Sequence, residues 1–283
     1  MAERGEDYNT GRRKLEAMTR PGIVFEYLPR IGIGAFNLTP RAIVAVMEES
    51  TDGLNLLYQS FYYGMADFYC PAARYIAGKG KSLLMNNFNK TSLLLAKAIT
   101  LGCWTEAEQI AEVARFALAD RRREYGELLC GFNEVNWTSV APFVLNLYAQ
   151  WSGKPFPMDD LPLRSMQAYE PLLSLWQSED LEALGKALTA ACDFHMERSN
   201  PSKAGNSEFS SAAQILFPVE ILALLRLRET KGLANPAINH PLLQTPIGRL
   251  HEIKSVPHDE MMDRAVANYL STLPPSVAEQ LLV

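Results

Sequence analysis

The run of residues 209–250 constrains this chain more than any other part of its sequence. Its first half, FSSAAQILFPVEILALLRLRETKG, places apolar residues on nearly every side of a helix, with few charged or polar interruptions. Such a helix must be enclosed by other elements, because a surface helix keeps one polar face. The second half is punctuated by prolines and contains HPLL at 240–243. We therefore predict that this run forms the structural centre of the fold.

The rest of the chain repeats apolar residues at helical spacing, and alternating strand patterns of useful length do not occur. One set of apolar residues falls at i, i+3, i+4, i+7 and i+8, which places all of its members on one side of a helix. These residues are Leu54, Leu57, Tyr58, Phe61 and Tyr62. The pattern predicts an all-α fold: a compact multi-helix bundle of antiparallel helical hairpins with little or no sheet.

Several local signals predict where helices begin. Thr39 before Pro40 is typical of an N-cap followed by the first helical position, where the missing proline N–H is not needed. Thr105 and Glu108 have the spacing of a capping box, and Ser178 is a candidate N-cap. The predicted helices cover 91–101, 105–120, 135–151, 163–177 and 179–197.

The chain has 283 residues, of which 48% are hydrophobic, so it can bury a continuous core. We interpret residues 1–283 as one all-α domain. The proline-rich connection 153–162 is the candidate boundary if the domain is divided.

Charge and cysteine content indicate the surroundings in which the chain works. The net charge is −5, which argues against a nucleic-acid partner, because binding along phosphates needs excess Lys and Arg. The four cysteines have no paired close spacing, so neither a disulfide framework nor a zinc cluster is indicated. The N-terminus lacks the apolar segment of a secretory signal, and no membrane span is expected. These features predict a cytoplasmic protein without a membrane partner.

Two patterns resemble reaction centres only in part. The residues GKS at 80–82 lack the opening glycine of a phosphate loop, because Tyr75 stands in its place. Cys192 and His195 lie three apart on a predicted helix and could share a metal ion, but no second pair completes a ligand set. A hydrogen-bonded core histidine is the favoured interpretation of His195.

A further set of residues suggests a metal-dependent phosphohydrolase, because imidazole and carboxylate groups together hold divalent ions. Its members are His240, His251, His258, Asp259 and Asp263. Asp259 behind Pro257 equally fits the first turn of a helix, where the helix dipole favours anions. No G-x-S-x-G nucleophile occurs. We therefore predict a protein that is not an enzyme and needs no cofactor or metal, and we keep the hydrolase as an alternative.

Four short motifs follow one another within residues 209–250: FPVEILALLRLR at 217–228, KGL at 231–233, NHPLL at 239–243 and TPIG at 245–248. Together they resemble the C-terminal part of helical immunity proteins from bacterial polymorphic-toxin and type VI secretion systems. The resemblance implies a cytosolic antitoxin that binds a cognate secreted toxin and occludes its active site, without a cofactor. An acidic antitoxin suits a basic toxin, for example a DNase.

Acidic residues near expected helix ends are the candidate toxin contacts. They are Glu106, Glu108, Glu112, Asp159, Asp160, Glu179, Asp180 and Glu182. A helical-repeat scaffold that binds peptides is a further alternative, because the chain contains helical pairs but no signature that recurs at a fixed period.

Overall fold

The prediction of an all-α fold is confirmed by the computed structural model, which describes residues 31–78, 88–120, 122–124, 127–132, 137–199, 208–209 and 211–277. For 31–37, 122–124 and 127–129 it describes the backbone alone. The sheet within these ranges is a short antiparallel pair, β1 (Arg122–Glu124) and β2 (Glu127–Leu129). Among the described residues, no helix combines the length and the hydropathy needed to cross a bilayer.

The remaining elements are helices. In chain order they are α2 (Ile31–Met47), α3 (Gly53–Ile76), α4 (Phe88–Leu101), α5 (Trp104–Ala119), α6 (Val140–Ser152), η2 (Gln167–Tyr169), α7 (Glu170–Leu175), α8 (Leu181–Arg198), α9 (Ala212–Leu216), α10 (Val219–Thr230), α11 (Pro241–Gln244), η3 (Pro246–Gly248) and α12 (Glu260–Leu270).

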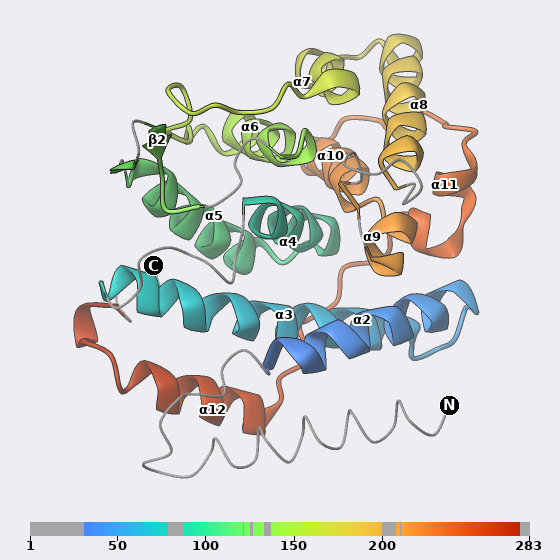
Figure 1. The fold of residues 1–283 in the computed structure, drawn as a ribbon. Coiled ribbons are helices and arrows are strands. Elements are labelled where there is room, and N and C mark those ends of the chain that lie inside the picture. Colours follow the sequence, from blue (N-terminus) through green and yellow to red (C-terminus); the bar gives the residue numbers. More distant parts are fainter. Residues whose placement is uncertain are drawn as a thin grey trace.

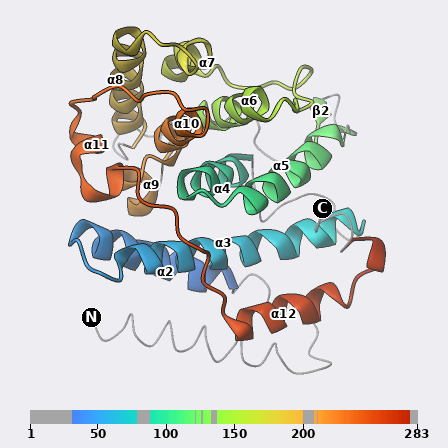
Figure 2. The same ribbon diagram turned by 180° about the vertical axis from the view of Figure 1, so that it is seen from behind.

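The helices form successive layers (Figures 1 and 2). The α2–α3 hairpin lies between α12 on one side and the group formed by α4, α5, α6 and α10 on the other. Helices α7 and α8 pack on the far side of that group, against α6 and α10. The largest cluster of buried apolar residues takes members from α2 through to Val277, so it joins these layers.

Helix α10 is the structural centre that the sequence predicts. Every residue from Val219 to Arg228 is buried, and the helix contacts α4, α6 and α8. Helix α5 also faces the core, because Ile110, Ala114 and Leu118 are fully buried. The connection 153–162 contributes Phe156, Met158 and Leu161 to the main core.

Two predicted helix starts are wrong. Helix α2 begins at Ile31 and contains Pro40, so Thr39 does not cap it. A proline inside a helix removes one backbone hydrogen bond, and the rest of this long helix forms nevertheless. Helix α5 has Cys103 at its N-cap position without a side-chain cap, so Thr105 and Glu108 form no capping box.

The start of α8 also differs from the prediction. Asp180, rather than Ser178, is the N-cap, and its carboxylate accepts a hydrogen bond of 2.9 Å from the Ala183 N–H. Leu181 stays 36% exposed, whereas Leu184 is fully buried, because the apolar stripe begins one turn into the helix.

The four cysteines are buried, and none of them forms a disulfide. Burial raises the pKa values of Cys70, Cys103 and Cys192 to about 12. Because the thiolate is the reactive form, we expect these thiols of the folded protein to react with iodoacetamide roughly a thousandfold more slowly than an ordinary thiol. Mass spectrometry should find these three cysteines alkylated only after unfolding. Rapid alkylation of any of these three in the native protein would contradict the assignment.

Candidate functional site

The centre of the motif-bearing run is a buried polar network around the first turn of α10. Glu220 is fully buried, and its Oε1 accepts hydrogen bonds from the Tyr169 hydroxyl at 3.2 Å and from His195 Nδ1 at 2.7 Å. The other ring nitrogen of His195 lies 3.1 Å from the Ile215 carbonyl, and the ring stacks on Phe209. The interpretation of His195 as a hydrogen-bonded core histidine is therefore confirmed.

Electrostatics favour an ion pair in this network. Burial alone lowers the pKa of His195, but the charge of Glu220 and the hydrogen bonds to the ring outweigh it and raise the pKa above its ordinary value. Both side chains are closed off from solvent. The network thus joins α8 to α10 and offers no surface to a substrate.

Arg228 is the second buried polar anchor of α10. Its guanidinium is fully buried and donates hydrogen bonds to three backbone carbonyls: those of Trp176 at 2.5 Å, Ser178 at 3.0 Å and Ala234, the last from Nε at 3.2 Å. All three acceptors are neutral backbone carbonyls, so the role of this arginine is structural. It ties the end of α10 to the connection between α7 and α8.

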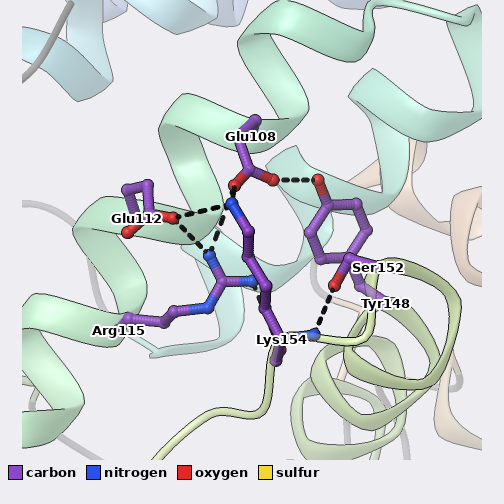
Figure 3. Close-up of polar contacts among 6 residues, drawn as sticks. All are labelled: Glu108, Glu112, Arg115, Tyr148, Ser152 and Lys154. Carbon is purple, nitrogen blue, oxygen red and sulfur yellow. Dashed lines mark hydrogen bonds and ion pairs between the residues drawn. The ribbon is translucent and has the colours of Figure 1, made fainter. Parts of the chain in front are cut away.

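Two acidic candidates on α5, Glu108 and Glu112, belong to a charged cluster with the end of α6 (Figure 3). The Glu108 carboxylate accepts hydrogen bonds from the Tyr148 hydroxyl at 2.7 Å and from Lys154 Nζ at 2.5 Å. Glu112 pairs with Arg115 Nη1 at 2.7 Å and lies 3.6 Å from Lys154 Nζ. The two glutamates are therefore already neutralised within the chain.

The contacts in this cluster lower the pKa of the Glu108 carboxyl group. Partial burial would raise its pKa, but the hydrogen bonds from Lys154 and Tyr148 outweigh this effect and lower the pKa to about 2. We expect carboxyl-carbon NMR titration to give this value, and Lys154→Met to move it toward the ordinary 4.5. Since the folded pKa is depressed, the pair stabilises the fold above pH 4.5 and its contribution is lost as the pH falls toward 2. A wild-type pKa near 4.5 would contradict the pairing.

The other acidic candidates differ in their availability to a partner. Asp180 caps α8, and Glu182 forms an exposed pair with Lys186 at 2.6 Å. Asp159, Asp160 and Glu179 are exposed. Glu106 is half-buried. Its negative charge contributes to the raised pKa values of Tyr69 on α3 and of Cys103 at the start of α5.

The residues of the hydrolase alternative do not form one metal site. Asp259 caps α12 and accepts a hydrogen bond of 2.7 Å from the Tyr63 hydroxyl. Asp263 accepts a hydrogen bond from Tyr62 and lies 3.5 Å from His258 Nδ1. These contacts fasten α12 to α3, and the small apolar cluster beneath them includes Met262 and Ala265 from α12.

The two remaining histidines of that set lie elsewhere in the fold. His240 caps α11 through the Leu242 N–H at 3.2 Å and lies 3.2 Å from Asp193 on α8. His251 follows η3 and lines a separate hollow beside α2. Among the described residues, no three His, Cys, Asp or Glu side chains converge on a point that could hold a metal ion.

The sequence signals did not reveal this hollow. It lies between the α2–α3 turn and the segment after η3, and it brings Glu49, Arg249 and His251 to one place. Its two walls are about two hundred residues apart in the chain, so no local spacing could have joined them. The motif TPIG at 245–248 was the one signal in the sequence for this site, because it marks the tight turn beside one wall of the hollow.

The phosphate-loop residues 80–82 lie outside the described part of the chain. Comparison with protein-family models, curated proteins and solved structures finds no match to this chain.

Proposed function

We propose that this protein is an antitoxin, an immunity protein that binds a cognate bacterial toxin and covers its active site. The observation that carries the proposal is the likeness of the motifs at 217–248 to helical immunity proteins. Those motifs lie on α10 and on the segment that follows it, where Arg228, Glu220 and His195 hold the helices together. Such a body is rigid before it meets a partner, and preorganisation lowers the entropic cost of binding.

The partner that suits this surface is a basic protein, such as a toxin that cleaves nucleic acid. The chain has a net charge of −5, and Asp159, Asp160 and Glu179 are exposed acids. Complementary charge would accelerate the encounter, and salt would weaken that effect because it screens exposed charges. Glu108 and Glu112 are less suited to direct contact, because a toxin would have to replace Lys154 and Arg115 as their partners.

Co-expression with the toxin encoded beside this gene tests the proposal. We expect the wild-type protein to restore growth of cells that produce the toxin, and the purified pair to form a stable complex whose association slows in high salt. Asp159→Lys/Asp160→Lys tests the exposed acids. Glu170→Lys/Glu260→Lys, which makes the same charge change at exposed sites outside the candidate set, is the matched control. Failure of the wild type to rescue cells from any neighbouring toxin would refute the proposal.

A further inference from the structure

Lys97 is a half-buried lysine on α4 whose amine meets a hydroxyl of α3 instead of a carboxylate. Its Nζ donates a hydrogen bond of 2.9 Å to the Ser60 hydroxyl oxygen. Lys97 forms no ion pair with any described residue. Four other lysines do form ion pairs: Lys90, Lys154, Lys186 and Lys254. Lys97 therefore carries its amine into the contact between two helices without a counter-charge.

The surroundings of this amine favour its neutral form. Ser60 is buried, and its hydroxyl donates to the Leu57 carbonyl at 2.7 Å, so its oxygen is left to accept from Lys97. The nearby Cys103 thiol is itself neutral at pH 7, because burial raises its pKa to about 12. Burial in these neutral surroundings disfavours the ammonium form and lowers the pKa of Lys97 to about 8.

A neutral amine at this position is a nucleophile. One of its N–H groups serves the Ser60 oxygen, and no described residue donates a hydrogen bond to the nitrogen lone pair. At pH 7.5 about a quarter of the Lys97 amines are unprotonated, against about a thousandth for a lysine with the ordinary pKa of 10.5. Removal of a lysine from water is a general way to activate its amine.

Three common electrophiles would give products that fit this site differently. Carbon dioxide would give a carbamate, whose negative charge burial disfavours. An aldehyde would give an imine, which has no N–H for Ser60 when neutral and carries a charge when protonated. An acyl phosphate would give an amide, which is neutral and keeps one N–H for the Ser60 oxygen. The site therefore suits the acyl product best, and a small acyl group suits a half-buried side chain.

We propose that Lys97 is an acylation site, modified at Nζ by a small acyl phosphate. The lone pair of Nζ attacks the carbonyl carbon, the N–C bond forms, and the C–O bond to the phosphate breaks. Phosphate leaves with the electron pair of that bond, and the nitrogen loses one proton to water. The proposal concerns the contact between α3 and α4 and does not depend on a toxin.

Acetylation of the intact protein by acetyl phosphate tests the proposal. Mass spectrometry follows the acetylated fraction of each lysine with time at pH 7.5, and Lys231, exposed at the end of α10, is the internal control. We expect Lys97 to react about tenfold faster than Lys231, because the gain in free amine exceeds the losses from lower basicity and partial burial. Its rate should level off near about pH 9, where its amine is almost fully unprotonated. A rate no higher than that of Lys231, or a rate that still rises above about pH 9, would overturn the inference.

Substitution of Ser60 tests whether the missing counter-charge makes Lys97 reactive. Ser60→Asp places a carboxylate beside the amine, which favours the ammonium form, so acetylation of Lys97 at pH 7.5 should fall at least about tenfold. Ser174→Asp makes the same change at an exposed serine on α7 and should leave the Lys97 rate as in the wild type. A Ser60→Asp variant that is folded by circular dichroism and reacts at the wild-type rate would overturn the inference. If this variant does not fold, the wild-type pH profile decides the question on its own.

Discussion

Replacement of Arg228 by methionine is expected to lower the free energy of unfolding by about 3–5 kcal/mol. The buried guanidinium is the donor for the carbonyls of Trp176, Ser178 and Ala234, and methionine supplies none of these hydrogen bonds. The Trp176 carbonyl would then be buried without this donor, and the partly buried carbonyls of Ser178 and Ala234 would lose theirs. Because folded proteins are stable by only about 5–15 kcal/mol, this one change should remove a large part of the total.

Urea unfolding followed by circular dichroism measures the effect. Lys231→Met is the matched control, because Lys231 is exposed at the end of the same helix, and it should change stability by less than about 0.5 kcal/mol. Arg228→Lys keeps the charge but not the planar group, so we expect it to recover only part of the loss. An Arg228→Met variant as stable as the wild type would show that the carbonyls find other donors.

The second large effect is expected at Glu220. Glu220→Ala leaves the buried imidazole of His195 without its partner, which typically costs about 3–5 kcal/mol. The double variant Glu220→Leu/His195→Phe replaces both members by apolar side chains and should be more stable than the single variant, since a buried pair replaced as a unit often costs little. If the urea midpoint of Glu220→Ala equals that of the wild type, the pair of Glu220 and His195 does not hold α8 to α10.

The same pair predicts a pH dependence of stability. The folded pKa of His195 is raised above its ordinary 6.5, so the folded protein binds the proton more tightly than the unfolded chain. The stabilisation is complete below pH 6.5 and is lost as the pH rises through the folded pKa. We therefore expect the stability difference between the wild type and His195→Gln to shrink as the pH rises above 6.5. A difference that grows with pH would mean that the imidazole is neutral in the fold.

The sequence was sufficient to predict the helices whose apolar pattern is strong. Helix α10 is buried along its length as its all-round apolar character predicts, and α4 and α5 form the predicted hairpin. The helix starts were less predictable, because several residues in a row can serve as caps. Ser178 and Asp180 are both good N-caps by residue type, and in the fold Asp180 caps α8 while the Ser178 hydroxyl accepts a hydrogen bond from the Asp180 N–H.

The polar contacts were harder to predict, because their partners are distant in the chain. Glu108 has a local capping spacing with Thr105, but in the fold it pairs with Lys154. The sequence likewise places His258, Asp259 and Asp263 together, yet Tyr62 and Tyr63 on α3 occupy the two aspartates. Residue spacing records which groups share a helix face, whereas tertiary packing decides which groups meet.

A stoichiometric titration distinguishes the proposed action by contact with a toxin from action by chemistry. The activity of a fixed amount of a candidate toxin from a neighbouring gene is measured as the purified protein is added. We expect the activity to fall in proportion to the added protein, to reach zero at one molecule per toxin and to be independent of incubation time. Complete inactivation by a small fraction of an equivalent, increasing with time, would show catalysis and contradict this expectation, as would full activity with the protein in excess.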